Sequence, residues 1–328
     1  MSAETRDSVL DAAALRRLER TALIDTGLLA VDLSPRDDRL AAALREAEVL
    51  FTGWGCPPLT PAVLAAMPRL RAVVHAAGSV KGHLTQAAWD RGITVSTAAR
   101  ANALPVAEYT LAAILFANKR VLAGADAYRR TRDRVRLLDQ FPAVGNYRRT
   151  IGVVGASAVG RRVIELLRPF DLTVLVQDPY LDPAGAAALG ATLVGLDDLV
   201  RRSDVVSIHA PELPETRGLF DAARIALMRD GATLVNTARG SLVDTGALTA
   251  ELVSGRLHAV LDITAPDILP AGSPLYDLPN VLLTPHMAGS LGGELRRLAD
   301  TAIDELERYA QGLPFAYPVH AAALAHSA

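Results

Sequence analysis

The sequence predicts an α/β protein built from two Rossmann-like, doubly wound domains, with a larger domain inserted into a smaller, discontinuous one. Two patterns predict this fold. Short apolar runs alternate with helical patterns along most of the chain, which favours parallel sheets covered by helices. From Thr150 onward these runs are apolar along most of their length, as in strands buried on both faces. The length of 328 residues suits about two domains.

The first hundred residues supply the expected strands and helices of the smaller domain. The expected strands are 48–53, 71–77 and 93–97, and the expected helices between them are 61–67 and 85–91. Pro105 then opens a long apolar helical stretch to about residue 130, and a polar, arginine-rich connection follows through Asn146.

The alternation restarts at Thr150 with six strand candidates: TIGVVG, TVLVQD, ATLVG, DVVSIHA, TLVNTA and HAVLDI. A further run, NVLLTPH, precedes the last expected helix at about 293–311, and Pro314 and Pro318 fit a terminal tail. We therefore place the larger domain at 103–290 and assemble the smaller one from 1–102 plus 291–328. The crevice between two such domains is the default place for a ligand.

The composition excludes several classes of protein. Half of the residues are hydrophobic and 21% are charged, which is too apolar for a disordered chain. The 34 basic and 36 acidic side chains nearly cancel, so we expect no nucleic-acid or membrane partner. The single cysteine, Cys56, excludes an internal disulfide and a multi-cysteine metal site, and we expect no metal. Neither a signal peptide nor an apolar run of roughly 20 residues is present, so we expect a cytoplasmic protein.

The first strand after Thr150 leads into a degenerate dinucleotide fingerprint. Gly155-Ala156-Ser157-Ala158-Val159-Gly160 stands between TIGVV and the helical pattern RRVIELLRPF, the strand–turn–helix setting that G-x-G-x-x-G requires. Gly155 can make the tight turn and Gly160 can let the helix pack closely, although Ser157 replaces the middle glycine. We expect Gly155, Ser157, Ala158 and Val159 to bind the cofactor, with its pyrophosphate at the helix N-terminus. The Ser157 hydroxyl could also donate to phosphate.

Asp178 ends the next strand, eighteen residues after Gly160. A carboxylate there can accept from both ribose hydroxyls and would repel a 2′-phosphate, so the pattern favours NAD over NADP. The alternative is that the glycines form an ordinary tight turn and Asp178 a cap. The strand, helix and acid in combination favour the dinucleotide.

Three further segments, VSIHAPELPETRGLF, TLVNTARGSLVDTGAL and AVLDITAPDILPAGSPLYDLPNVLLTPHMAGS, resemble the D-isomer-specific 2-hydroxyacid dehydrogenases. The resemblance runs from about residue 48 to about 312. It implies hydride transfer between NAD(H) and a small D-2-hydroxy acid or its 2-keto partner, with 103–290 as the NAD-binding domain and the smaller domain binding substrate. It also implies a homodimer formed through the nucleotide domain. The 131–149 segment could be an arm of that dimer or a solvated loop.

The resemblance assigns the catalytic residues. Arg239 of NTARG matches an arginine whose fork of donors suits a carboxylate and its adjacent keto oxygen. His286 of TPHMAGS matches the histidine that would give a proton to the carbonyl oxygen and take it back in reverse. The family usually has Glu as the acidic partner, and here Asp267 stands at that position. The Asp267 carboxylate would orient the His286 ring and favour its protonated form. Its side chain is one methylene shorter than the usual Glu.

The resemblance also assigns the remaining binding residues. The turn after the second strand, Ala77-Gly78-Ser79, would present backbone N–H groups to the substrate carboxylate, although the commoner G-x-G-x-D pattern is missing. Asp262 would contact the carboxamide side of the nicotinamide. The other expected cofactor contacts are Thr110, His209, Ala210, Thr216, Thr237, Ala238 and Gly289. We interpret His75, His83, His258 and His320 as structural, and Trp54 and Trp89 as core residues.

Two alternatives to an enzyme stay open. One is an NAD-sensing binding protein, like the transcriptional corepressors that share this fold, because such regulators can retain the catalytic residues. The other is a catalytically weakened relative, suggested by Ser157 and Asp267 together. The sequence does not name the substrate.

Overall fold

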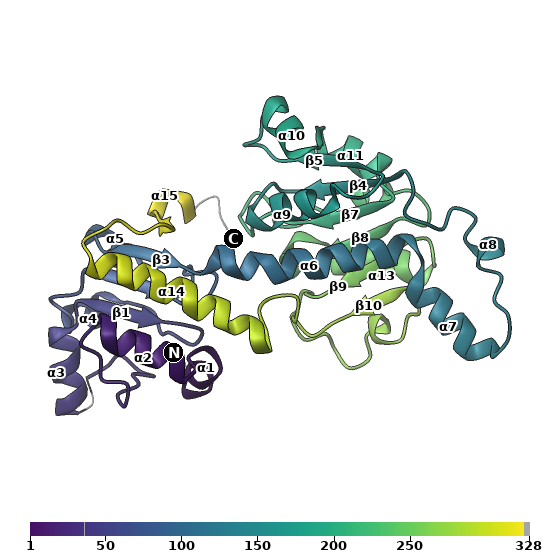
Figure 1. Cartoon of the computed structure of the whole chain (residues 1–328). Helices are drawn as coiled ribbons and strands as arrows, with labels where there is room; N and C mark the ends of the chain where they lie inside the picture. Colours follow the sequence, from purple (N-terminus) through teal and green to yellow (C-terminus); the bar gives the residue numbers. More distant parts are fainter. Residues whose placement is uncertain (36, 325–328) are drawn as a thin grey trace. The chain divides into compact units, whose positions relative to one another are not determined.

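The computed structural model describes residues 1–35 and 37–324, and it divides into two compact units. Of the described residues, 1–102 and 290–324 form the smaller unit and 103–289 form the larger unit (Figure 1). Each unit contains its own parallel sheet, which confirms the predicted α/β class. Residues 325–328 of the expected substrate domain lie outside the described residues.

The smaller unit has a sheet of order β1-β2-β3-β11, in which the first three strands are parallel. Strands β1 (Val49–Thr52), β2 (Ala72–His75) and β3 (Thr94–Thr97) alternate with helices α4 (Pro61–Ala65) and α5 (Gln86–Asp90). Three helices precede them: α1 (Ala3–Val9), α2 (Ala12–Thr21) and α3 (Asp38–Glu46). The chain returns as η3 (Gly292–Glu294), α14 (Leu295–Ala310), β11 (Pro318–Val319) and α15 (Ala321–Leu324).

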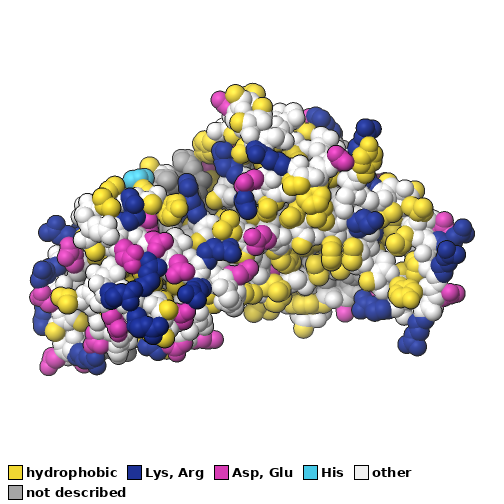
Figure 2. Space-filling model, in the orientation of Figure 1, with side chains coloured by type: hydrophobic (Ala, Val, Ile, Leu, Met, Phe, Trp, Pro, Cys, Tyr) yellow, Lys and Arg dark blue, Asp and Glu magenta, His cyan; other side chains and the backbone are white. Residues whose placement is uncertain are grey.

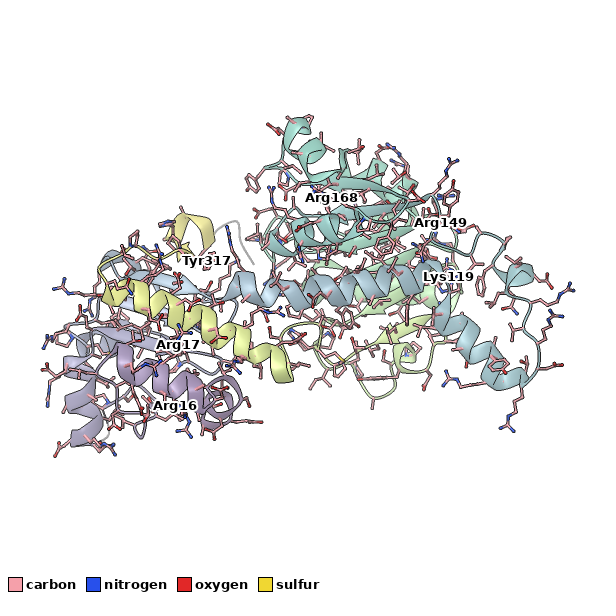
Figure 3. The ribbon with its side chains drawn as sticks, viewed as in Figure 1. Arg16, Arg17, Lys119, Arg149, Arg168 and Tyr317 are labelled. Atoms are coloured by element: carbon pink, nitrogen blue, oxygen red, sulfur yellow. The ribbon has the colours of Figure 1, made fainter. Side chains whose placement is uncertain are left out.

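The returning helix α14 is fastened to the N-terminal helices. Arg17 of α2 forms ion pairs with Asp304 and Glu307 of α14, each at 2.8 Å (Arg17 is labelled in Figure 3). These two carboxylates raise the pKa of Arg17. Leu18 and Ile303 pack in a common core beneath this contact. The smaller unit is therefore assembled from both ends of the chain.

Strand β11 corrects the expectation of a plain terminal tail at Pro314 and Pro318. Pro318 and Val319 pair antiparallel with Ser96 and Val95 of β3. Pro318 is tolerated because β11 is an edge strand, where a missing N–H costs no ladder hydrogen bond. The buried carboxylate of Glu305 holds the segment, since it accepts from Ser96 Oγ at 2.7 Å and from the Ala316 N–H at 3.0 Å.

The larger unit has an all-parallel sheet of order β10-β9-β8-β7-β4-β5-β6. Its strands are β4 (Arg149–Val154), β5 (Leu172–Gln177), β6 (Thr192–Leu193), β7 (Val205–Ile208), β8 (Thr233–Asn236), β9 (His258–Leu261) and β10 (Val281–Leu283). The expected strand ATLVG thus shortens to two residues.

Helices cover both faces of this sheet and bury its apolar runs. One core packs α6 (Ala99–Asn118), α9 (Ala158–Leu167) and α10 (Pro183–Leu189) against the strands. The other packs α11 (Leu196–Arg202), α12 (Ala222–Ala226) and α13 (Thr245–Val253) against the opposite face. The short elements α7 (Val121–Thr131), α8 (Leu137–Gln140), η1 (Gly240–Leu242) and η2 (Pro274–Tyr276) complete the unit. This is the doubly wound arrangement that the apolar strands predict.

The long helix after β3 differs from its prediction at both ends. It begins at Ala99, six residues before Pro105, so the proline lies inside the helix rather than at its start. It ends at Asn118, and Arg120 adopts a left-handed φ of 53°. The Arg120 guanidinium donates to Gly231 O and to Thr233 Oγ1, so the chain turns there to follow that contact. The stretch from 106 to 130 therefore forms two helices.

Of the two tryptophans, both predicted to be core residues, only one packs against the core. Trp54 is 42% exposed, so its expected place in the core is wrong. Trp89 is partly buried and packs against the core of the smaller unit, as expected. No helix in the described part of the chain is long and apolar enough to span a membrane.

Candidate functional site

The carboxyl edge of the larger sheet gathers most of the predicted site residues. Because all the strands are parallel, every loop that follows a strand leaves from this one edge. In the spatial order of the strands, the residues that follow them are His286 after β10, Asp262 after β9, Arg239 after β8, His209 after β7, Gly155 after β4 and Asp178 after β5. The residues expected to act on substrate thus follow β8 to β10, and most of those expected to bind the cofactor follow β7, β4 and β5.

The turn after β4 requires glycine at two positions. Gly155 has φ +94°, and an added Cβ would lie 2.7 Å from the Ala210 nitrogen in the loop after β7. A Cβ on Gly160 would overlap the Gly155 carbonyl oxygen. Helix α9 therefore starts directly against strand β4, which is the close approach that a dinucleotide turn needs.

Ser157, which replaces the middle glycine, is the N-cap of α9. Its backbone is extended, with φ −64°, so this position does not need a glycine conformation. The Ser157 Oγ accepts from the Gly160 N–H at 3.3 Å, which leaves the hydroxyl proton available. Within the described residues, the backbone N–H groups of Ser157, Ala158 and Val159 donate to no protein acceptor. These groups at a helix N-terminus fit a pyrophosphate.

Asp178 fastens the turn after β5 to the glycine-rich turn. One carboxylate oxygen accepts from the Ala156 N–H at 2.7 Å, and the other accepts from the Tyr180 N–H at 2.8 Å. Each oxygen still has a lone pair that a ribose hydroxyl could reach. The residues of this half of the edge thus fit the adenosine and pyrophosphate parts of NAD.

His209 and Thr216, both expected cofactor contacts, also make hydrogen bonds within the protein. His209 is buried, burial lowers its pKa to about 3, and its Nε2 lies 2.8 Å from Ser207 Oγ. The Thr216 hydroxyl donates to Pro211 O at 2.6 Å and accepts from the Leu213 N–H at 2.8 Å. These side chains shape the loop after β7, while Ala210 provides the backbone that faces Gly155.

Arg239 follows β8 in a loop held by Asn236. The Asn236 side chain accepts from the Ala238 N–H at 3.0 Å and donates to the Arg239 carbonyl at 2.9 Å. The guanidinium donates to Ala238 O at 2.6 Å, and it forms no ion pair with any carboxylate that the structure describes. A half-buried arginine without an acidic partner has unused, fixed donors, and it suits an anionic ligand.

Gly240 brings the Arg239 loop against the loop that carries Asp267. An added Cβ on Gly240 would lie 2.5 Å from the Ala265 nitrogen and closer still to the Thr264 carbonyl. Thr245 Oγ1 also donates to Ala265 O, at 2.9 Å. Asp267 itself is exposed, and no hydrogen bond or ion pair joins it to His286 in residues 1–35 and 37–324. The expected acid–histidine pair therefore stays a prediction.

His286 is held in an unusual backbone conformation by Asp262. His286 has a left-handed φ of 52°, which is unfavourable for a residue other than glycine. The buried Asp262 carboxylate accepts from the Met287 N–H at 2.8 Å and the Ala288 N–H at 2.9 Å, and the Asp262 carbonyl accepts from the His286 N–H at 3.0 Å. The His286 side chain is exposed to solvent and available for a ligand.

Two hydroxyl residues that the sequence analysis missed join this group. Thr284 donates to Asp262 at 2.6 Å, and Tyr109 of α6 lies 2.7 Å from Thr284. The neighbouring Thr110, predicted as a cofactor contact, lies 3.3 Å from Thr237 at the end of β8. No local pattern predicts the meeting of Tyr109 and Thr284, because 175 positions separate them.

The predicted Ala77–Ser79 turn lies in the smaller unit, directly after β2. The backbone N–H groups of Ala77, Gly78 and Ser79 donate no hydrogen bond within the described residues. Three successive free donors at the carboxyl end of a strand can form an anion-binding turn. The backbone here thus fits a carboxylate, as the resemblance implies.

The chain was compared with known protein families. Residues 111–288 match the family model described as D-isomer specific 2-hydroxyacid dehydrogenase, NAD binding domain. The chain belongs to this family.

Curated relatives agree with that family assignment. The chain is 37% identical to a D-3-phosphoglycerate dehydrogenase of Mycobacterium tuberculosis over 277 residues, which cover 84% of this chain and 51% of that protein. It is 33% identical to a glyoxylate reductase of Aeropyrum pernix, over 85% of this chain and 84% of that protein. The chain spans about half the length of the phosphoglycerate dehydrogenases that it matches.

A solved structure of a Thermus thermophilus protein superposes with a TM-score of 0.75 at 29% identity, covering 95% of this chain and 97% of that one. This likeness in fold covers both units of the chain. Among the described residues of this chain, no group of three or more His, Cys, Asp or Glu residues is placed to hold a metal.

Proposed function

We propose that this chain is an NAD-dependent oxidoreductase that interconverts a small D-2-hydroxy acid and its 2-keto acid. The observation that supports the proposal most strongly is the edge formed by β8, β9 and β10. On that edge an arginine without an acidic partner and a solvent-exposed histidine follow strands separated only by β9. The donors of the glycine-rich turn, further along the same edge, support NAD as the cofactor.

Each residue has a separate task in this proposal. When bound, NAD(H) supplies or accepts the hydride. Arg239 binds the substrate carboxylate and polarises the keto oxygen with its paired donors. His286 gives a proton to that oxygen during reduction and removes it during oxidation. Asp267 stabilises the protonated imidazole electrostatically. Asp262 holds the His286 loop and receives the carboxamide side of the nicotinamide.

We propose a substrate of the size of glyoxylate or hydroxypyruvate, as in glyoxylate and hydroxypyruvate reductases. The relative named glyoxylate reductase supports this, since the match covers most of both chains. The free N–H groups of Ala77, Gly78 and Ser79 support a carboxylate on the substrate, and we assign them to its binding.

The test is NADH oxidation, followed by its absorbance, with glyoxylate, hydroxypyruvate, pyruvate and bulkier keto acids. The proposal expects turnover of at least one small keto acid and its loss in His286→Ala, with NADH binding retained. Tight NADH binding with no turnover of any keto acid would instead support an NAD-sensing protein.

We also propose that the chain forms a homodimer through the larger unit. A pocket of about 220 Å³ lies between α6 and strands β9 and β10, with a mainly apolar lining that includes Tyr109, Phe116 and Leu282. Figure 2 shows hydrophobic side chains gathered over these elements, and Phe116 is 54% exposed. Light scattering should give twice the chain mass, and Phe116→Asp should halve it. The control, Leu23→Asp at a fully exposed position of the smaller unit, should remain dimeric.

A further inference from the structure

Three polar side chains from separate parts of the larger unit form a continuous chain of hydrogen bonds. Tyr109 Oη of α6 lies 2.7 Å from Thr284 Oγ1, and Thr284 Oγ1 lies 2.6 Å from Asp262 Oδ1. A carboxylate can only accept, and a threonine hydroxyl has a single proton. Thr284 therefore donates to Asp262, and Tyr109 must donate to Thr284. The direction of the relay is thus fixed, from α6 toward the carboxylate.

The relay ends on the carboxylate that sets the conformation of His286. Both oxygens of Asp262 accept N–H groups from the two residues after His286, at 2.8 Å and 2.9 Å. A third bond, from the His286 N–H to the Asp262 carbonyl, spans 3.0 Å. A left-handed residue other than glycine persists only where its surroundings enforce that conformation. Asp262 provides this enforcement, and the Thr284 hydroxyl orients one of its two oxygens.

The residue after Tyr109 makes a similar contact with the neighbouring loop. Thr110 Oγ1 lies 3.3 Å from Thr237 Oγ1, two residues before Arg239, and both threonines are buried. Adjacent residues of one helix therefore touch the strand end before Arg239 and the loop before His286. Helix α6 is a rigid element that contacts both loops through these hydroxyls.

We propose that Tyr109 is a positioning residue for His286, acting through Thr284 and Asp262. The inference rests on the proposed function, in which His286 transfers the proton. In this role Tyr109 acts on His286 only through Thr284 and Asp262. Its hydroxyl keeps Thr284 aligned on Asp262, so that the imidazole is presented at one fixed place to the substrate oxygen. Proton transfer depends on such placement within a fraction of an ångström.

The test uses Tyr109→Phe, Thr284→Val, Thr284→Ser and the Tyr109→Phe/Thr284→Val double variant in the full chain. Tyr109→Phe should lower kcat for keto-acid reduction about three- to tenfold, the effect of one lost hydrogen bond. Thr284→Val should lose at least as much, and Thr284→Ser should recover it. In the valine background Tyr109→Phe should have no further effect, because the relay is already broken.

A matched control separates this role from general packing. Tyr309→Phe also removes a single phenolic hydroxyl, one that lies 3.2 Å from Glu48 in the smaller unit, and it should leave kcat unchanged. Equal kcat in Tyr109→Phe and wild type, or full additivity in the double variant, would overturn the inference.

A second measurement does not need turnover. Amide hydrogen exchange of the peptide covering residues 284–288, followed without substrate, should be faster in Tyr109→Phe than in wild type and unchanged in Tyr309→Phe. If the wild-type chain reduces no keto acid, the proposed function fails, and this exchange comparison still decides whether the relay holds the loop. Identical exchange in Tyr109→Phe and wild type would then overturn the inference.

Discussion

Replacing Gly240 with alanine tests whether the loops that carry Arg239 and Asp267 must lie in contact. The new Cβ would lie 2.5 Å from the Ala265 nitrogen and closer to the Thr264 carbonyl, and all these atoms are backbone. Because the contacting atoms are backbone, no side chain can rotate away, and the two loops must separate by about 1 Å. A displacement of that size in an active site can lower the rate roughly a hundredfold. The overpacking itself should lower the free energy of unfolding by about 1–3 kcal/mol.

The assay measures kcat/KM for the best keto acid, the dissociation constant of NADH and the melting temperature. Gly240→Ala should lose about a hundredfold in kcat/KM. Its affinity for NADH should fall far less, because the glycine-rich turn that binds the pyrophosphate is on other strands. The control is Gly272→Ala in the same unit, where an added Cβ meets nothing within 4 Å, and it should behave as wild type. Gly160→Ala should show the reverse pattern, with NADH binding lost first. Near-wild-type kcat/KM in Gly240→Ala would refute the reasoning.

The remaining predictions concern single side chains. Arg239→Lys keeps the positive charge but loses the paired donors of the guanidinium. We expect kcat/KM to fall about a hundredfold, a loss of about 3 kcal/mol of transition-state stabilisation, and undiminished turnover would contradict the role of Arg239 in substrate binding. The wild-type chain should have a higher kcat/KM with NADH than with NADPH, and Asp178→Ala should reduce the ratio of the two values. A wild-type preference for NADPH would contradict the role of Asp178. Asp267→Asn should lower kcat for keto-acid reduction, because it removes the negative charge proposed to act on His286, whereas an unchanged kcat would remove Asp267 from the mechanism. Burial lowers the pKa of His75 to about 3 from 6.5, so only the unfolded chain gains this proton between those values. His75 alone should therefore lower the free energy of unfolding as pH drops below 6.5, by up to about 1.4 kcal/mol per pH unit. Because burial also lowers the pKa of His209 and His258, His75→Gln should reduce the slope in denaturant titrations rather than abolish it.

The larger sheet could be predicted from sequence because its strands are buried on both faces and so read as continuous apolar runs. The elements that escaped prediction depend on distant partners. Strand β11 exists because Glu305 binds Ser96 across 209 positions, and a local pattern shows only the two prolines. Helix α6 begins six residues before Pro105 and so contains it, and Arg120 ends it by reaching Gly231.

The site shows the same division. Motifs place Arg239, Asp262 and His286 on neighbouring strand ends, because parallel strands share one carboxyl edge. The bonds from Asp262 to the loop after His286 follow only from the left-handed backbone there, and no periodicity encodes that conformation. The contact of Tyr109 with Thr284 depends on how α6 lies over the sheet. The Ser157 cap could be recognised from the helix start that follows it.

The strand order of the larger sheet bears on how this chain can be re-engineered. Asp178 and Arg239 follow β5 and β8, which are separated by β4 and β7. At about 4.8 Å per strand this is roughly 14 Å, beyond the 7–10 Å within which mutational effects usually interact. Substitutions that exchange the dinucleotide and substitutions that retune the acid should therefore combine additively in free energy. Cofactor choice and substrate choice can thus diverge independently along one edge. A mutant library can therefore vary the two halves separately, and the best variants of each half can then be combined.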